Sequence, residues 1–440
     1  MSAAIDLLIE PSWIIPIEPA GLVLDGHALA IDKGRIIALL PAAEATDRYT
    51  PHQHLRLPGK VLLPGFVNLH THAAMTLLRG YADDLPLMRW LQEHIWPAEA
   101  KYLSPQFVHD GTLLAAWEML RGGITCFNDM YFFPEAAAKA AVEAGMRAVL
   151  GITVIEFPTA YAADAGDSLN KGLAARDNWR EEPLLTFALA PHAPYTVSDR
   201  SFERLVTLAD QLDLPVHIHV HETEHEIEDS LKQYGVRPIE RLRRLGLLGP
   251  GLIAVHAVHL LAEEIAILAE HGCTVAHCPT SNMKLASGIP PIPAMLAAGT
   301  RVGLGTDGAA SNNRLDILRE MRHAALLAKA VSGDPTALPA HQALRMATLE
   351  GAAALGLDSA IGTLEAGKQA DLCAVELDDW LSRPCFDPAS HVVYVAGREQ
   401  VSHVWVGGQL RICDGRPVDG AVDQLVDIAA SWQNSLVNFI

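Results

Sequence analysis

The pattern of hydrophobic and polar positions divides the chain into a long central region and two shorter flanks. From about residue 60 to residue 310, short apolar runs rich in β-branched residues end in polar residues and alternate with helix-like segments. Eight such runs occur, at residues 61–72, 124–129, 147–153, 184–192, 215–222, 252–256, 274–277 and 302–307. Strands that alternate with helices pair in parallel. Eight of these units predict an α/β fold with a (β/α)₈ TIM barrel.

Residues that begin and end helices stand between the runs. The helix-like segments at 134–144 and 262–271 are followed by Gly145 and Gly272, and glycine is common directly after the last helical residue. Ser198 stands where a helix over 198–212 would begin, and serine is a favoured first capping residue. These signals support the alternation of strands and helices.

The two flanks have a different pattern, with short alternating runs broken by turns such as Asp25-Gly26 and Asp414-Gly415. Neither flank holds enough strands for a sheet of its own. Two independent hairpins are the alternative, but isolated hairpins are marginally stable in water. We therefore expect residues 1–60 and 366–440 to form one small β-sandwich module, with the barrel of residues 61–365 inserted between its halves.

Composition narrows the functional classes. The 440-residue chain is 50% hydrophobic and 19% charged, with a formal net charge of −19, which disfavours binding to nucleic acid. The first residues carry Asp6 and Glu10 in place of a basic region, so they do not resemble a signal peptide. No apolar run reaches the roughly 18 residues of a membrane helix. The six cysteines form no CxxC pair, which suits a reducing compartment. We expect a cytoplasmic protein with no membrane partner.

The candidate chemistry lies in histidines and acids at the ends of the expected strands, where barrel enzymes place catalytic groups. His70 and His72 end the first strand, and their i, i+2 spacing directs both imidazoles to one side. His219, His256 and Asp307 end the fifth, sixth and eighth strands. One HxH pair is weak support for a metal, but the same residue types on four strands are strong support. Imidazoles and one carboxylate suit Zn²⁺ with a position left for water.

Two further histidines in the fifth run leave open which residue of this run binds the metal. His217 and His221 share the side of the strand on which His219 lies, so spacing alone does not choose the ligand. Residues 221–225 also match HExxH, the zinc signature of metallopeptidases, which requires a helix. Here the motif follows the alternating run PVHIHVH, and a peptidase site would leave the other histidines and Asp307 unused. The zinc signature of cytidine deaminases is absent.

Five motifs occur in order along the barrel: PGFVNLHTH, HVHE, AVHAVHL, HCPTSNMKLASG and LGTDGAASNN. Together they resemble the amidohydrolase superfamily, in particular its methylthioadenosine/S-adenosylhomocysteine deaminase branch. The resemblance spans the barrel and continues into GTLEAGKQADL. It implies that the metal ligands are His70, His72, His219 and Asp307.

The resemblance also implies the catalytic groups. Glu222 and His256 match the acid–base glutamate and its partner histidine, and Asp307 matches the residue that takes a proton from the attacking water. His192 stands at the end of the fourth strand, where members with two metals have a lysine. We therefore expect one Zn²⁺ per subunit, with Fe²⁺ or another divalent ion as the alternative. The resemblance further suggests a homodimer.

Five positions bear on the substrate. Trp90, Glu99 and His192 match positions beside a nucleoside, with Glu99 at the ribose hydroxyls and Glu222 at the base. Ordinary helix packing explains Trp90 equally well, and a helix dipole would also favour Glu99. Ile152 matches the place of an arginine that pairs with the carboxylate of S-adenosylhomocysteine. Without that cation a bound carboxylate loses a hydrogen bond of about 1.5–3 kcal/mol. An apolar wall of Ile152, Ile155 and Phe157 would suit a methylthio group.

The expected function is zinc-dependent hydrolytic deamination of an adenine nucleoside at C6. The preferred reaction converts 5′-methylthioadenosine to 5′-methylthioinosine and ammonia, with S-adenosylhomocysteine or adenosine as further substrates. A deaminase of a free purine base such as guanine, and a triazine-type chlorohydrolase, are the alternatives. A metallopeptidase and a zinc-binding protein without catalysis are more remote. The sequence leaves the roles of His217, His221 and His277 open.

Overall fold

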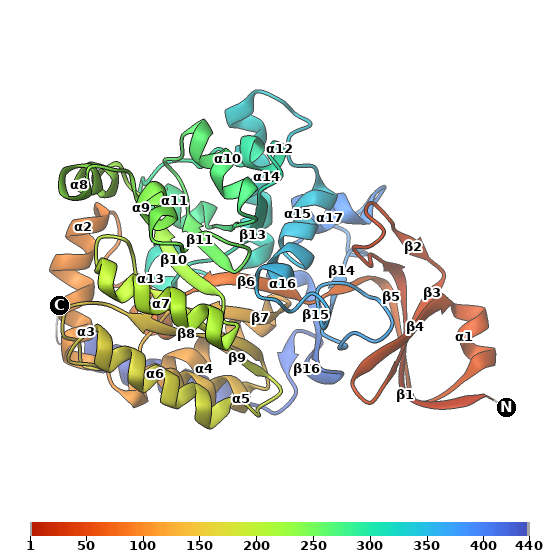
Figure 1. The fold of residues 1–440 in the computed structure, drawn as a ribbon. Helices are drawn as coiled ribbons and strands as arrows, with labels where there is room; N and C mark the ends of the chain where they lie inside the picture. The colour runs from red at the N-terminus through yellow and green to blue at the C-terminus, as the bar shows by residue number, and fades with distance from the viewer. Residues whose placement is uncertain (1, 438–440) are drawn as a thin grey trace.

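A computed structural model describes residues 2–437, and eight parallel strands form its central barrel (Figure 1). Neighbouring strands pair in sequence order from β6 to β13. The barrel strands are β6 (Phe66–Thr71), β7 (Ile124–Asp129), β8 (Arg147–Val154), β9 (Leu185–Pro191), β10 (Val216–Val220), β11 (Leu252–His256), β12 (Thr274–His277) and β13 (Arg301–Leu304). The predicted (β/α)₈ barrel is confirmed.

The seam between β13 and β6 is closed by a few hydrogen bonds in place of a ladder. The backbone N–H of Asp307 donates to the carbonyl of His70 at 3.0 Å. Beside this bond, the amide of Asn68 donates to the Thr306 hydroxyl at 2.8 Å and accepts from the Thr306 N–H at 2.9 Å. The seam therefore joins the two segments that carry His70 and Asp307, and it fixes their relative position.

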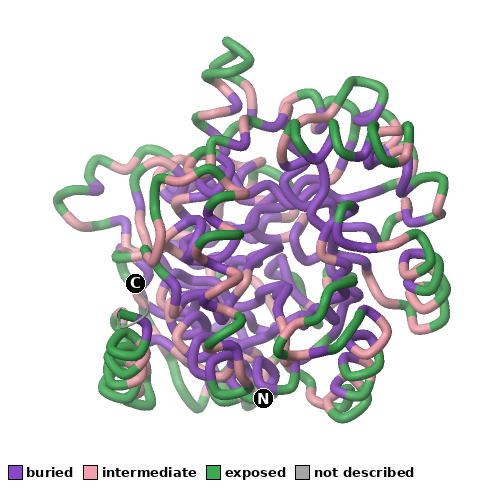
Figure 2. Tube along the Cα trace, turned by 90° about the vertical axis from the view of Figure 1, so that its left-hand side faces the viewer, coloured by how far each residue is buried: buried purple, intermediate pink, exposed green. Residues whose placement is uncertain are grey.

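Helices cover the outside of the barrel, and buried residues run through its centre while exposed ones lie at the periphery (Figure 2). Ser198 caps α7 by accepting the N–H of Ser201, and Gly145 ends α5 in the left-handed conformation, both as expected. The helices around the barrel are α4 (Pro105–Arg121), α5 (Pro134–Ala144), α6 (Ala165–Trp179), α7 (Asp199–Leu212), α8 (Glu224–Tyr234), α9 (Pro238–Arg244), α10 (Ala262–Glu270), α12 (Ile292–Ala297) and α14 (Ile317–Ser332).

Helix α16 (Leu349–Ala354) closes the amino-terminal end of the barrel. Ala352 and Leu355 pack against Val67 and Leu69 of β6, so α16 and its flank fill that end. The carboxyl ends of the strands are left for a cavity. The short helices at this carboxyl end are η1 (Ala73–Leu78), α2 (Leu87–Arg89), the π-helix η2 (Trp90–Ile95), α3 (Trp96–Tyr102), α11 (Pro279–Lys284) and α13 (Ala309–Asn312), whereas α15 (Ala340–Met346) precedes α16.

Both chain ends contribute to one mixed sheet beside the barrel, as predicted (Figure 1). Its order is β17-β16-β15-β14-β5-β1-β3-β4, with β2 paired to β1. Apolar side chains pack in separate clusters that include Leu7 and Leu62 in one and Ile5 and Leu8 in another. The strands are β1 (Ala3–Ile14), β2 (Leu24–Asp25), β3 (His27–Asp32), β4 (Arg35–Pro41), β5 (Tyr49–Pro64), β14 (Leu372–Glu376), β15 (Val401–Val406), β16 (Gln409–Cys413) and β17 (Arg416–Pro417).

The first predicted run, residues 61–72, is two strands, because β5 ends at Pro64 and β6 begins at Phe66. Gly65 lies between them, and a Cβ atom there would stand 2.1 Å from the Thr125 hydroxyl. Only glycine allows this close approach, so the chain passes from sheet to barrel at that residue. The run was predicted as one strand because both strands are apolar.

The remaining helices are α1 (Ala42–Arg48), which packs beside the mixed sheet, and α17 (Pro388–Tyr394), η3 (Arg398–Gln400) and α18 (Val422–Val437). Helix α18 packs against α4, where the Trp432 indole N–H donates to Asp110 at 2.9 Å. A buried ion pair between Arg147 of β8 and Asp371, at 3.0 Å, joins the barrel to the segment before β14. None of the helices within residues 2–437 has the length and apolar character needed to cross a membrane.

Candidate active site

A cavity of about 540 Å³ opens at the carboxyl ends of the barrel strands. Its floor holds His72, His219, His256 and Asp307, and its walls come from the segment after β6, the loops after β7, β8 and β9, and the segment after β13. The wall residues are mostly apolar or aromatic, with a few polar groups among them. They include Trp90, Leu91, Ile95, Trp96, Glu99, Tyr131, Phe132, Thr153, Ile155, Phe157, His192, Tyr195 and Ser311.

Four histidines on the cavity floor are each held through the Nδ1 atom. In His70 this atom lies 2.9 Å from His217 Nε2, and in His72 it lies 2.6 Å from the Met130 carbonyl. In His219 it lies 2.7 Å from the His192 carbonyl, and in His256 it lies 2.8 Å from Asn282 Oδ1. An Nδ1–H that donates to such an acceptor leaves a lone pair on Nε2. This outer hydrogen bond is the arrangement that orients histidine ligands in metal sites.

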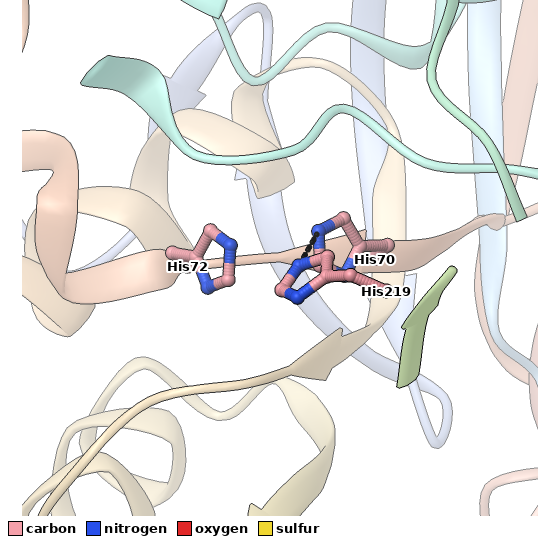
Figure 3. A group of neighbouring side chains, drawn as sticks. All are labelled: His70, His72 and His219. Carbon is pink, nitrogen blue, oxygen red and sulfur yellow. Dashed lines mark hydrogen bonds between the residues drawn. The ribbon is translucent and has the colours of Figure 1, made fainter. Parts of the chain in front are cut away.

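The Nε2 atoms point toward a common centre, where a divalent cation fits. In Figure 3 the rings of His70, His72 and His219 lie around one space. Ligand atoms of these three lie within 4.8 Å of one another, as do those of His70, His256 and Asp307. Burial lowers the pKa of His70 to about 4, so its ring is neutral at pH 7. The Nε2 atoms of His70 and His219 stand 3.3 Å apart, and two lone pairs at that distance repel unless a cation lies between them.

Asp307 completes this donor set from just beyond β13, in a left-handed conformation with φ of 61°. One carboxylate oxygen, Oδ1, lies 3.3 Å from His70 Nε2 and 3.4 Å from His72 Nε2. The other oxygen, Oδ2, accepts the hydroxyls of Ser281 at 2.6 Å and Ser311 at 2.9 Å. Burial acts to raise the pKa of Asp307, but its contacts with the surrounding histidines, His70 above all, hold this pKa well below its usual range. The aspartate is therefore an ionised group with one oxygen directed at the cation position.

Glu222 and His256 face each other beside this position. Glu222 Oε2 lies 3.8 Å from His256 Nε2, and Glu222 Oε1 lies 3.4 Å from the Ser287 hydroxyl. Burial raises the pKa of Glu222, while the neighbouring His256 opposes that shift. A carboxyl group with a raised pKa can donate a proton near neutral pH. Asn282 of α11, the short helix after β12, holds His256.

The wall of the cavity holds the residues predicted to contact a nucleoside. Glu99 accepts a hydrogen bond from the Tyr131 hydroxyl at 2.6 Å, and burial raises the pKa of Glu99. His192 contacts the Thr196 hydroxyl at 3.0 Å through Nδ1, and Trp90 lines the opposite wall from η2. Sequence reasoning missed Tyr131, although it directly follows the polar end of β7. The structure thus brings Trp90, Glu99 and His192 into one cavity.

Ile152 does not line this cavity. In β8 alternate side chains face opposite sides of the sheet, and Thr153 is the residue that faces the cavity. The Ile152 side chain packs outward against Gly172 of α6, where a Cβ atom would stand 2.2 Å from it. The structure therefore contradicts the placement of Ile152 in the cavity wall, whereas Thr153 and Ile155 do line the cavity. Among residues 2–437, no lysine or arginine lines it.

The HExxH residues do not converge, because His221 lies between β10 and α8, outside both elements. Its Nε2 accepts the Ile239 N–H at 3.2 Å, and His225 is 65% exposed in an ion pair with Asp229. His217 supports His70, as described above. His277 is buried at the end of β12 and does not line the cavity. The peptidase interpretation is therefore not supported by this arrangement.

Comparison with known proteins shows to which family the chain belongs. The model of a family described as the amidohydrolase family matches residues 61–411. A Teredinibacter turnerae protein named 5-methylthioadenosine/S-adenosylhomocysteine deaminase is 46% identical over 435 residues, covering 99% of this chain and 98% of the relative. A Saccharophagus degradans protein of the same name is 44% identical over 428 residues, covering 97% of this chain and 96% of the relative.

Solved structures agree with the sequence relatives. An adenosine deaminase from Xanthomonas campestris with bound zinc superposes with a TM-score of 0.98 at 49% identity, covering 100% of both chains. An atrazine chlorohydrolase from Arthrobacter aurescens complexed with zinc has a TM-score of 0.88 at 25% identity, covering 97% of this chain and 99% of the other. Both neighbours hold zinc, and the histidines and aspartate described above fit the same ion.

Proposed function

The chain belongs to the amidohydrolase family, and we propose that it deaminates adenine nucleosides hydrolytically at C6 with the help of one bound Zn²⁺. One observation carries this proposal. Glu222 and His256 face each other at 3.8 Å beside a converging set of three imidazoles and one carboxylate, all on the floor of a cavity whose wall holds Glu99. The names of the relatives, which are deaminases of adenine nucleosides, support the same reaction.

His70, His72, His219 and Asp307 would hold the cation. When bound, Zn²⁺ acidifies a water at its open position to a pKa of about 7. The chain's own contribution is to orient these ligands through the Nδ1 contacts and through Ser281 and Ser311. Because the four ligands come from β6 and the residue after it, from β10 and from the loop after β13, the barrel itself sets the spacing of the site.

Proton transfer is divided between two carboxyl groups. Glu222 donates a proton to the ring nitrogen N1, which makes C6 electrophilic, and Asp307 accepts a proton from the attacking water. A C–O bond then forms at C6, and the O–H that remains on the incoming oxygen donates a hydrogen bond to His256 Nε2. Asp307 passes its proton to the amino group, the C6–N bond breaks and ammonia leaves, while the hydroxyl proton returns to Glu222 and a carbonyl forms at C6. General acid–base steps of this kind contribute about 10²–10⁴-fold to a rate.

Recognition of a nucleoside is assigned to the cavity wall. Glu99, held by Tyr131, would accept the ribose hydroxyls, and His192 and Trp90 would contact the sugar and the base. A buried carboxylate that receives two hydroxyl donors discriminates against ligands that lack them, because its own polar atoms are then left unpaired. Glu99 therefore favours a nucleoside over a free base such as guanine or over a triazine.

We further propose that an uncharged 5′ substituent, such as the methylthio group of 5′-methylthioadenosine, is preferred. Ile155, Phe157, Trp96 and Phe132 give this part of the wall an apolar surface. The absence of lysine and arginine from the lining, within residues 2–437, leaves the carboxylate of S-adenosylhomocysteine without a cation. That loss costs about 1.5–3 kcal/mol.

An ultraviolet deamination assay with ammonia detection tests both proposals. The zinc-loaded protein would be given 5′-methylthioadenosine, S-adenosylhomocysteine, adenosine, guanine and cytosine, with metal-stripped protein as the control. We expect turnover of the adenine nucleosides, the highest kcat/KM for 5′-methylthioadenosine, and none with guanine or cytosine. Turnover of guanine alone would overturn the proposed function. An equal or higher kcat/KM for S-adenosylhomocysteine would overturn only the preference.

A further inference from the structure

Glu226 is a buried carboxyl group in α8 that does not line the cavity. Its Oε1 accepts the backbone N–H of His221 at 2.9 Å, and its Oε2 accepts the backbone N–H of Glu222 at 2.9 Å. We infer that Glu226 is a positioning residue, which holds the backbone of Glu222 so that the Glu222 carboxyl reaches the substrate. This inference rests on the proposed function, in which Glu222 protonates the base.

The backbone that Glu226 holds is a strained turn. Strand β10 ends at Val220, and His221 has a left-handed φ of 56°. A residue with a Cβ atom in that conformation costs about 1–2 kcal/mol, so surrounding contacts must maintain it. The turn redirects the chain from the strand toward α8 and places Glu222 at the cavity wall. If the turn relaxed, Glu222 would move with it.

The two hydrogen bonds that the Glu226 carboxyl accepts from His221 and Glu222, here called the clamp, extend an ordinary helix cap. Thr223 is the capping residue of α8, and its hydroxyl accepts the N–H of Glu226 at 3.3 Å. In a standard capping box the glutamate three residues later returns a hydrogen bond to the capping residue itself. Here Glu226 instead reaches the two residues before Thr223, which joins the start of the helix to the catalytic glutamate.

Within residues 2–437, few contacts hold the Glu222 side chain itself. Its side chain has one hydrogen bond, a long contact of 3.4 Å from the Ser287 hydroxyl. The carbonyl of His221 accepts the N–H groups of Val258 and His259, at 3.0 and 3.1 Å, so the start of the turn is held from the β11 side. The N–H groups of His221 and Glu222 depend on Glu226. A displacement of about 1 Å at a reacting group can lower a rate 100-fold.

Burial raises the pKa of Glu226 to about 8, and the two N–H donors oppose that shift. At pH 7 the carboxyl group of Glu226 is therefore protonated and uncharged, and substitution by glutamine keeps both the size of the side chain and its lack of charge. Its amide, however, has only one oxygen, so an NH₂ group must face one of the two backbone N–H donors. The variant Glu226→Gln therefore removes half of the clamp with little change in volume.

The experiment compares Glu226→Gln with two controls on the same helix. Glu228→Gln makes the same change at an exposed position, and Thr223→Ala weakens the helix cap while leaving both Glu226 acceptors in place. Zinc content, kcat, KM and ligand binding are measured for each protein. The binding pair is adenosine and its 1-deaza analogue, which lacks the ring nitrogen that Glu222 would protonate.

For Glu226→Gln we expect one zinc per chain, a KM within about twofold of wild type, and a kcat lower by about 10–100-fold. The binding preference of wild type for adenosine over the 1-deaza analogue should fall toward one. The two controls should keep kcat within about threefold. A merely structural role for Glu226 would lower stability without changing this preference.

Three results would overturn the inference: a wild-type kcat in Glu226→Gln, an equal loss in Thr223→Ala, or an unchanged preference against the analogue. If Glu226→Gln does not fold, Glu226→Asp carries the same test, because the shorter side chain keeps both carboxyl oxygens but withdraws them from the turn. Absence of deamination by wild-type protein would instead overturn the proposed function, while loss confined to the Glu226 variants concerns this inference alone.

Discussion

The Nε2 atom of His256, at the end of β11, and the Oε2 atom of Glu222, two residues beyond β10, stand 3.8 Å apart. His256 is fixed from behind by Asn282, at 2.8 Å, and Glu222 by the turn at His221. The space beside them is where a base edge and an incoming oxygen would meet. The division of labour between this pair leads to the first two predictions.

Glu222→Gln should keep zinc and lose turnover. The amide has nearly the same shape as the carboxyl group but cannot donate its proton to N1, so kcat should fall by about 10²–10⁴-fold. Zinc content by elemental analysis and kcat by the ultraviolet assay check this on one preparation. Wild-type turnover in a zinc-loaded sample would remove Glu222 from the mechanism.

Asn282→Ala should lower kcat by about 10–100-fold with zinc retained, because loss of an orienting hydrogen bond to a site histidine has costs of that order. The Asn282 carbonyl is what His256 Nδ1 contacts, and without it the ring can rotate away from Glu222. Asn170→Ala, the same change on the surface of α6, is the matched control and should have wild-type kinetics. Equal kinetics in both variants would mean that His256 needs no such support.

The proposed ligands His70, His72, His219 and Asp307 and the HExxH motif predict opposite effects of histidine substitutions on zinc content. His219→Ala should reduce zinc to well below one per chain, since three donors remain of the four. His225→Ala should keep a full complement, because that side chain is 65% exposed and pairs with Asp229. Elemental analysis after dialysis against a fixed zinc buffer compares the two variants. Loss of zinc in His225→Ala alone would restore the peptidase interpretation.

Much of the site could be predicted because its residue types are rare at strand ends. His70, His72, His219, His256 and Asp307 each follow a buried run, and a barrel brings such positions together. The choice of His219 as the metal ligand among the three histidines of the fifth run depended on the family resemblance. Strand alternation alone predicted that all three side chains lie on one side.

Other features were beyond the sequence. Ile152 was placed in the substrate wall, but the side on which each β8 residue points is set by register with β7 and β9, and Thr153 faces the cavity instead. Tyr131 and Asn282 act through tertiary contacts with Glu99 and His256, which no local pattern encodes. A single apolar run likewise concealed the passage from β5 to β6 at Gly65.

Glu320 predicts a dependence of stability on pH. Burial raises its pKa to about 7 from the 4.5 of an exposed glutamate, against opposing hydrogen bonds from Thr280 and Asn312. Between about pH 4.5 and 7 the folded chain holds a proton that the unfolded chain has lost, so this residue's contribution to stability falls as pH rises through that window. Relative to Glu320→Gln, wild type should lose about 1–3 kcal/mol of unfolding free energy between pH 4.5 and pH 7.5. Urea unfolding of both proteins across the range checks this, and parallel curves would contradict it.

Phe157→Arg should shift the substrate preference toward S-adenosylhomocysteine. Phe157 is 40% exposed, lines the cavity and packs near Trp96, so a longer side chain there can extend along the wall without burying its charge. A guanidinium that pairs with the amino-acid carboxylate would contribute about 1.5–3 kcal/mol, which raises the ratio of kcat/KM for S-adenosylhomocysteine to that for 5′-methylthioadenosine by about 10–100-fold. Phe157→Leu keeps the wall apolar and should leave this ratio near its wild-type value. An equal shift in both variants would show that added space, and not charge, governs the preference.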